Sequence, residues 1–306
     1  MNVYAIWLEW PEECFRLSPG NLKTFRSLAP RESRIIRAKN EREFVSALSS
    51  ATHAITWSFK REWYAKAPRL KAVATPAAGR ELVAEPPEGS RVKVHFGAYH
   101  GETMAESVAA YVLSWARGFF LPEMKRFWPR KAVSGKCYTL AGTKAVIAGY
   151  GHVGRKIGEK LSGLGVEVKG FGRAGRKELV SAMHSADWFV MALPATPETD
   201  NFLSAEMLSR LPPRAVVVNV GRGNAIDENA LLASLRAKRI AGACLDVCKG
   251  EPTAVKGRTP AKEAAVIAAA RAGRLPANLF LTPHSSAFSP EYLDMAFREM
   301  KDDGFV

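Results

Sequence analysis

The sequence predicts an α/β protein in which a doubly wound parallel sheet is joined to a second, smaller α/β domain. Beyond residue 144, near-continuous apolar strands alternate with helix-compatible segments, a pattern typical of a parallel sheet covered on both faces. A glycine-rich turn directly follows the first of these strands. A chain of 306 residues, 47% hydrophobic and 24% charged, is long enough for two domains, and its composition excludes a disordered or fibrous protein.

Charge and cysteine content restrict the environment and the partners of the chain. The net charge of +14 favours anionic ligands, but the basic residues are scattered and form no recognition motif, so we expect no nucleic-acid partner. No stretch approaches the roughly 20 apolar residues that a membrane span requires, and we expect a cytoplasmic protein. The four cysteines lack zinc-type spacing, which predicts reduced structural thiols and no metal site.

The first hundred residues predict the smaller domain. Short apolar runs separated by polar, helix-compatible stretches occupy residues 3–8, 53–57, 70–74 and 92–96. Residues 288–306 are expected to return to this domain, because nothing after His284 extends the second sheet. The shortness of this tail predicts only a minimal last helix.

A long helix over residues 101–120, with Pro122 at its end, is expected to bridge the two domains and to open the second, over residues 101–287. The regular alternation that follows predicts strands at residues 144–148, 166–170, 188–192, 215–220, 242–247 and 279–281, and helices at 153–164, 177–184, 205–211 and 228–237. The Ala-rich stretch 260–276 suits an extra short helix.

The glycine-rich turn has the pattern G-x-G-x-x-G at Gly149, Gly151 and Gly154, between a strand and an amphipathic helix. The first glycine permits a tight turn, the second lets backbone N–H groups approach a pyrophosphate, and the third allows the helix to pack closely on the strand. The amino end of the helix adds partial positive charge. This context predicts a Rossmann-type dinucleotide site.

The segment about 20 residues further on predicts which dinucleotide is preferred. The carboxylate that would accept hydrogen bonds from an NAD ribose is absent from residues 171–176, where Arg173 and Arg176 stand instead. Because guanidinium groups bind phosphate through charge-assisted hydrogen bonds, we expect NADP, with NAD as the alternative. The other interpretation is that both arginines are solvated loop charges of a basic protein.

Three later segments carry Arg222, Glu251 and His284, and each follows a predicted strand. Residues beyond the carboxyl ends of the strands line the ligand crevice of a doubly wound sheet, so these three side chains are expected to converge. Here the sequence resembles the D-isomer-specific 2-hydroxyacid dehydrogenase family. The resemblance rests on the glycine turn and on the segments 193–199 (LPATPET), 221–227 (GRGNAID), 245–252 (LDVCKGEP) and 282–284 (TPH).

The resemblance implies a flavodoxin-like substrate domain and a catalytic set of Arg222, Glu251 and His284. Arg222 would pair with the carboxylate of a 2-oxo acid and polarise its carbonyl. His284 would donate the proton as hydride arrives, and Glu251 would favour the protonated imidazole and set its tautomer. The expected reaction is hydride transfer between NADPH and a small 2-oxo or 2-hydroxy acid.

The turn and the resemblance together predict further binding residues. The expected cofactor contacts are Gly149, Gly151, His152, Val153, Gly154, Gly172, Arg173, Arg176, Leu193, Pro194, Thr199, Val220, Asp246, Ser286 and Thr103. Asp246 has the alternative role of supporting the strand end. The expected substrate contacts, besides Arg222, are Ala77, Ala78 and Gly79, whose successive N–H groups would form an anion nest. The alternative for these three is an ordinary turn of small residues.

Other functions stay open from the sequence. A formate dehydrogenase of the same fold would resemble a variant with Gln at position 251 and Asn at position 100, where this chain has Glu251 and His100. The C-terminal-binding-protein corepressors use the fold as a cofactor-sensing scaffold, and only turnover separates them from enzymes. The side chain of the 2-oxo acid is not defined.

The aromatic segment 119–128 predicts a homodimer formed through the dinucleotide domain, with burial inside the same chain as the alternative.

Overall fold

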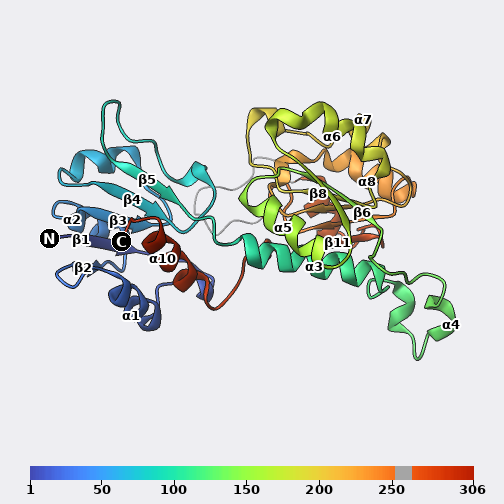
Figure 1. Ribbon diagram of the computed structural model, residues 1–306, viewed down its shortest axis with the longest axis horizontal. Coiled ribbons are helices and arrows are strands. Elements are labelled where there is room, and N and C mark those ends of the chain that lie inside the picture. Colours follow the sequence, from blue (N-terminus) through green and yellow to red (C-terminus); the bar gives the residue numbers. More distant parts are fainter. Residues whose placement is uncertain (252–263) are drawn as a thin grey trace. The chain divides into compact units, whose positions relative to one another are not determined.

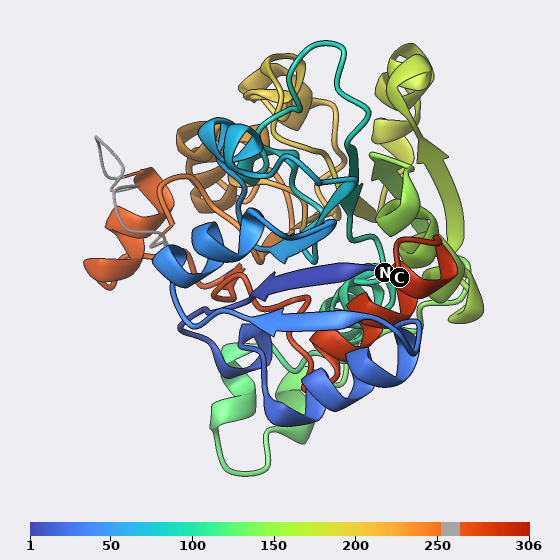
Figure 2. The ribbon, with the colours of Figure 1, turned by 90° about the vertical axis from the view of Figure 1, so that its left-hand side faces the viewer.

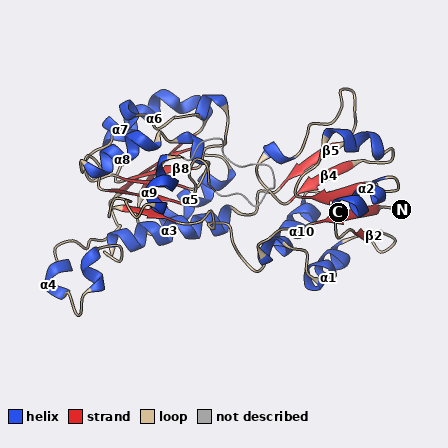
Figure 3. Cartoon of the chain, turned by 180° about the vertical axis from the view of Figure 1, so that it is seen from behind, coloured by secondary structure: helices blue, strands red, loops and turns tan. Residues whose placement is uncertain are grey.

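The computed structural model describes residues 1–251 and 264–306, and it divides the chain into two compact units. The first unit comprises residues 1–100 and 288–306, and the second comprises residues 101–287. Figure 1 labels many of the helices and strands of both units, and Figure 3 shows the strands of each sheet with helices beside them. No helix of the described residues is long and apolar enough to cross a membrane.

Within the described residues, the first unit holds a parallel five-stranded sheet in the order β2-β1-β3-β4-β5. The strands are β1 (Val3–Trp7), β2 (Arg34–Arg37), β3 (His53–Thr56), β4 (Ala72–Thr75) and β5 (Lys93–Phe96). The sequence missed β2, because only Ile35 and Ile36 of this edge strand are apolar and arginines flank them. Short edge strands with charged ends are a common protection against unwanted strand pairing.

Helices α1 (Pro19–Leu28), α2 (Glu41–Leu48) and α10 (Tyr292–Asp302) complete the first unit. The expectation of a minimal last helix is wrong: α10 has 11 residues and buries Tyr292, Leu293, Ala296, Phe297 and Met300. It lies beside α1 (Figure 2). The ring centroids of Phe25 and Phe297 are 5.0 Å apart between the two helices. A strongly amphipathic face of three turns buries enough apolar surface to hold the tail in place.

The described residues of the second unit form a parallel six-stranded sheet in the order β11-β10-β9-β8-β6-β7. The strands are β6 (Lys144–Ala148), β7 (Glu167–Phe171), β8 (Trp188–Met191), β9 (Val216–Asn219), β10 (Gly242–Leu245) and β11 (Leu279–Leu281). The chain passes from β6 to β7 on one side and then returns to β8 on the other. This reversal makes the carboxyl ends of β6 and β8 the topological switch point, where open α/β sheets bind ligands.

Helices cover both faces of this sheet because the strand residues are apolar on both faces. On one face α3 (Gly101–Ala116) and α5 (His152–Gly163) pack on residues such as Ile147 and Val190. The opposite face is covered by α6 (Arg176–Ala182), α7 (Ala205–Ser209), α8 (Glu228–Arg236) and α9 (Ala265–Arg271). The expected extra helix in 260–276 is α9, and positions 260–263 lie outside the described residues.

The first helix of the second unit is shorter than the predicted 101–120. Helix α3 ends at Ala116, and Gly118 follows in the left-handed conformation with φ +73°, which stops the helix. The next residues form a short helical turn, Pro122–Lys125, and then α4 (Arg130–Val133). This segment carries Phe119, Phe127 and Trp128, whose exposed fractions are 63%, 99% and 78%.

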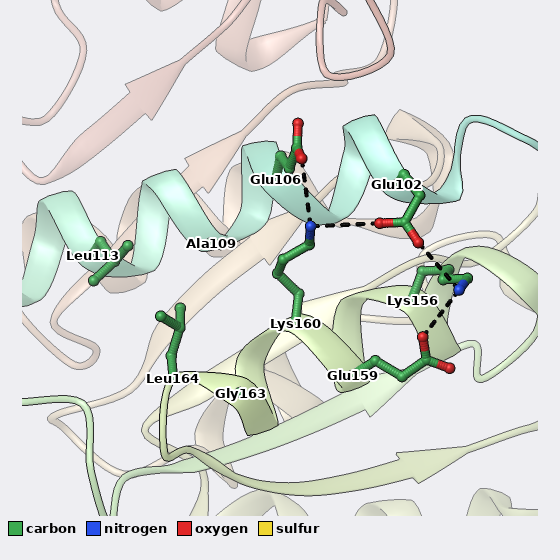
Figure 4. Close-up of a pocket in the computed structure, with 9 residues that line it drawn as sticks. All are labelled: Glu102, Glu106, Ala109, Leu113, Lys156, Glu159, Lys160, Gly163 and Leu164. Carbon is green, nitrogen blue, oxygen red and sulfur yellow. Dashed lines mark hydrogen bonds and ion pairs between the residues drawn. The ribbon is translucent and has the colours of Figure 1, made fainter. Parts of the chain in front are cut away.

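Ion pairs also join α3 to α5 (Figure 4). Lys156 lies 3.1 Å from a Glu102 oxygen, and Lys160 lies 3.4 Å from oxygens of Glu102 and Glu106. Exposed pairs of this kind contribute about 0–1 kcal/mol each, so the apolar contacts beneath them dominate the packing. The pairs line a surface hollow of about 630 Å³ whose lysines and glutamates offset one another, and it lies along the helices rather than at the strand ends.

Candidate active site

The glycine turn connects β6 to α5 at the switch point. Gly149 has φ +93°, and a Cβ there would lie 2.5 Å from the Ala192 carbonyl oxygen. A Cβ at Gly154 would lie 2.1 Å from the Gly149 oxygen. Both positions therefore require glycine for the fold itself. At Gly151 an added Cβ would meet no protein atom within 4 Å, so the fold leaves open space beside the amino end of α5.

This open space fits a dinucleotide, because a pyrophosphate approaching the backbone would occupy the position of the missing Cβ. His152 and Val153 form the first turn of α5 beside it. Gly172 follows β7 and also faces open space, with Arg173 and Arg176 exposed next to it. The residues present thus fit a nicotinamide dinucleotide.

The neighbouring loop after β8 is shaped by its own side chains. The Thr199 hydroxyl donates to the Pro194 carbonyl at 2.6 Å and so closes the turn. A Cβ at Gly221 would lie 2.6 Å from the backbone nitrogen of Leu193, so a glycine is needed for the close approach of the segments that follow β9 and β8. Thr199 therefore has a structural role, and Leu193, Pro194 and Val220 lie at the carboxyl end of the sheet.

Glu251 and His284 form a pair at the carboxyl ends of β10 and β11. The Nδ1 of His284 lies 2.7 Å from a carboxylate oxygen of Glu251, and the two side chains are 49% and 32% exposed. The hydrogen bond from Glu251 raises the pKa of His284 above its usual value; partial burial and the Arg222 charge oppose this effect, while the Asp246 charge adds to it. Because an ionised carboxylate only accepts hydrogen bonds, Nδ1 carries the proton and Nε2 remains for other chemistry.

The loop that carries His284 is tied to Asp246, whose residue is 1% exposed. The carboxylate accepts hydrogen bonds from Thr282 Oγ1 at 2.6 Å, Ser285 N at 2.9 Å and Ser286 N at 3.0 Å. His284 itself has φ +53°, a conformation that non-glycine residues rarely adopt and that the surrounding contacts must impose. Asp246 thus fixes the backbone from which the imidazole projects.

Arg222 comes from the loop after β9. Its Nη1 donates to the Gly221 carbonyl at 3.0 Å, and its charge acts on His284. Asn219, fully buried at the end of β9, donates to the Arg222 carbonyl at 3.1 Å and accepts from Gly221 N at 3.1 Å. The structure therefore brings Glu251 and His284 together, and Arg222 acts on His284 through its charge.

A comparison with known proteins assigns the family. The profile of the D-isomer specific 2-hydroxyacid dehydrogenase NAD binding domain matches residues 110–286. The chain belongs to this family. The predicted doubly wound fold is confirmed as well: the NAD-complexed D-isomer specific 2-hydroxyacid dehydrogenase of Lactobacillus delbrueckii ssp. bulgaricus superposes with a TM-score of 0.77 over 99% of this chain and 96% of that one, at 18% identity.

Two further relatives illustrate the range of the family. The glycerate dehydrogenase of Methylorubrum extorquens is 31% identical over 169 residues, which are 54% of this chain and 50% of the relative. This chain therefore aligns with only half of that relative's length. The Xanthobacter autotrophicus Py2 family member solved with NADPH and MES has a TM-score of 0.67 over 99% of this chain and 96% of its own, at 23% identity.

Other contacts of this 2-hydroxyacid dehydrogenase family member were not foreseen from its sequence. The Tyr111 hydroxyl lies 2.7 Å from Thr282 Oγ1, and Ser107 donates to the Ser286 carbonyl at 3.1 Å. Both come from α3 and brace the His284 loop. Polar residues on the otherwise apolar face of α3 were the available signal. Thr103 lies in the first turn of the same helix.

The predicted substrate loop lies in the first unit. Residues 77–79 follow β4, but none of them has a positive φ, and Gly79 is extended at φ −70° and ψ 130°. An anion nest built from alternating right- and left-handed residues is therefore absent here. Gly97 N donates to the Ala77 carbonyl at 3.1 Å, so the loop supports the end of β5. Binding of a carboxylate at Ala77, Ala78 and Gly79 stays a prediction.

Proposed function

We propose that this protein is an NADPH-dependent reductase of a small 2-oxo acid, with oxidation of the D-2-hydroxy acid as the reverse reaction. The single observation that carries the proposal is the hydrogen-bonded Glu251–His284 pair, on which the Arg222 charge acts, at the carboxyl edge of the six-stranded sheet. A carboxylate-binding cation and a proton-donating imidazole at such an edge match the needs of this reaction.

Each side chain has a defined task in the proposed reaction. Arg222 pairs with the substrate carboxylate and polarises the carbonyl, which holds the reacting carbon in place. A nicotinamide cofactor, when bound, would supply the hydride for that carbon. His284 Nε2 donates a proton to the carbonyl oxygen, so the C=O group becomes CH–OH and the imidazole becomes neutral. Glu251 stabilises the imidazolium before this transfer.

The reaction is tested by NADPH oxidation with a panel of 2-oxo acids that includes glyoxylate, hydroxypyruvate, pyruvate and phosphohydroxypyruvate, and by formate with NADP in the opposite direction. We expect at least one oxo acid to be reduced and formate to be inert.

His284→Ala should lower kcat about 10²- to 10⁴-fold while NADPH affinity stays unchanged. Arg222→Ala should raise KM and lower kcat, since its contacts act before and during the reaction. Full activity of His284→Ala would refute the mechanism, and inactivity with every oxo acid would favour a cofactor-sensing scaffold.

The preference for NADP over NAD rests on Arg173 and Arg176. The Arg176 guanidinium lies 5.3 Å from the centroid of the Phe202 ring, a cation–π contact that orients it. Arg173 is close enough to Glu198 to contribute to the lowered pKa of that carboxyl group. Both arginines are exposed at the end of β7, where a ribose 2′-phosphate would lie.

Replacing both arginines by Ala should reduce the ratio of NADP to NAD affinity at least about tenfold, because each charge-assisted bond contributes roughly 1.5–3 kcal/mol before screening by solvent. Arg236→Ala/Arg239→Ala, which removes two exposed cations at and just after the end of α8, is the matched control and should leave the ratio unchanged. Equal affinity of the unmodified protein for NAD and NADP would defeat the preference.

The exposed aromatic residues of segment 119–128 support a homodimer. Phe119, Phe127 and Trp128 are exposed, whereas Phe120 stacks on Phe280 with ring centroids 3.6 Å apart. Burial inside the same chain thus accounts for Phe120 and leaves the other three rings for a second copy.

The four cysteines are free thiols, which supports the proposal of a reducing, cytoplasmic location.

A further inference from the structure

Among the buried ionisable side chains that the mechanism does not use is a carboxylate, Glu228. Glu228 is the first residue of α8 and is only 4% exposed. Burial raises the pKa of its carboxyl group, and hydrogen bonds from backbone N–H groups oppose that rise. Withdrawing a carboxylate from water costs free energy unless hydrogen bonds replace its lost hydration.

The Glu228 carboxylate joins two segments that are distant in sequence. One oxygen accepts from Lys249 N at 2.6 Å, and the other accepts from Val266 N at 2.9 Å. The Ala265 backbone also acts to lower the pKa of this carboxyl group. Ala265 and Val266 open α9, whose N-cap residue is Ala264 and has no side chain that could cap the helix. Glu228 therefore caps α9 from a different helix, and the same carboxylate holds the backbone at Lys249.

The residue held at Lys249 lies two positions before Glu251. Between them Gly250 turns the chain with φ +62°. The Glu251 carboxylate then reaches back to Cys248 N at 3.3 Å and forward to His284 Nδ1 at 2.7 Å. On the other side of this loop, a Cβ at Gly223 would lie 2.1 Å from the Cys248 carbonyl carbon. The Glu251 loop is thus confined between Gly223 and Glu228.

Both confining residues belong to one segment, 221–228, which also carries Arg222. We propose that Glu228 is a positioning residue that couples the Arg222 segment to the Glu251 loop and thereby holds Glu251 in register with His284. The hydrogen bonds of the Glu228 carboxylate go to backbone N–H groups and not to the side chains of Glu251 or His284. Its effect passes through the Lys249 amide and the Gly250 turn. The catalytic part of this inference rests on the proposed function.

The key variant is Glu228→Gln, whose amide keeps the size of the side chain but presents a donor to at least one backbone N–H group. We expect kcat to fall about 10- to 100-fold, the magnitude typical of residues that orient a catalytic group, while NADPH affinity changes less than about twofold. Asn229→Ala, at the exposed next position of α8, is the control and should leave both quantities unchanged.

A second readout needs no turnover. The chain has 6 histidines, so the ring protons of His284 can be assigned by NMR from His284→Gln and titrated in the free protein. The groups that act on His284 are Glu251, Asp246 and Arg222. We expect Glu228→Gln and Glu251→Gln each to lower the pKa of His284. In the Glu228→Gln/Glu251→Gln double variant, the Glu228 change should have no further effect.

The outcomes separate this proposal from the proposed function. An unchanged His284 titration in a folded Glu228→Gln protein would overturn the coupling, even if activity fell. If Glu228→Gln does not fold, Glu228→Asp replaces it, since it keeps the charge but is one methylene too short to reach both segments. A lowered His284 pKa in a protein that reduces no oxo acid would sustain the coupling and reject only the reaction.

Discussion

Replacing Asp246 by Asn tests how the histidine loop is held. In the structure, both carboxylate oxygens of Asp246 accept hydrogen bonds, one from Ser286 N and the other from Ser285 N and Thr282 Oγ1. Asparagine has nearly the same shape but presents one acceptor and one NH2 donor. Whichever way the amide turns, at least one backbone N–H of the loop then faces a donor.

The expected loss of stability in the loop follows from the number of N–H groups left without an acceptor. A buried donor left without an acceptor costs about 1–3 kcal/mol, and the hydrogen bonds that remain lose the contribution of the ionised acceptor. Since Asp246 is 1% exposed, water compensates little of this loss. We expect the loop to be destabilised by roughly 2–4 kcal/mol, which corresponds to about thirty- to seven-hundred-fold easier local opening.

Amide hydrogen exchange measures this opening directly at Ser285 and Ser286. The Asp246→Asn protein should exchange both amides faster by the factor above, while amides in β8 keep their protection. Thr282→Val is the control: it removes the hydroxyl that bonds both Asp246 and Tyr111 but leaves both backbone N–H groups on the carboxylate. The Ser285 and Ser286 amides should then change their exchange rates less than about tenfold. Unchanged protection in Asp246→Asn would refute the reasoning. If NADPH affinity fell without that change, Asp246 would be a cofactor contact instead.

Three further predictions concern other parts of the protein. Glu251→Gln removes the hydrogen-bonded charge that raises the pKa of His284; because reduction requires the protonated imidazole, the rate of oxo-acid reduction should fall away at lower pH than in the unmodified enzyme, and an identical pH profile would exclude this pairing. Gly154→Ala places a methyl group 2.1 Å from the Gly149 oxygen, so the turn must shift, and calorimetric binding of NADPH should weaken at least about tenfold. Phe127→Asp, at a side chain 99% exposed, should convert a dimer into a monomer in sedimentation experiments at micromolar concentration; a monomeric unmodified protein would contradict the proposed dimer.

Local sequence patterns were sufficient to predict the architecture of the second unit. The alternation of apolar strands and amphipathic helices predicted its parallel sheet, and the G-x-G-x-x-G turn located its switch point, because both depend on period and on backbone freedom within a few residues. The three motif residues Arg222, Glu251 and His284 could be expected to converge, since each follows a parallel strand of one sheet.

Only the tertiary structure decided what holds those residues in place. Asp246 and Glu228 act through backbone N–H groups of segments 20 to 40 positions away. Because nearly every residue type has a backbone N–H group, the sequence does not indicate which of these groups a carboxylate binds. The end of α3 at Ala116 and the full length of α10 were likewise missed. A glycine in the left-handed conformation stops the first helix, and burial of an apolar face against α1 stabilises the second, so in both cases conformation and packing outweigh local propensity.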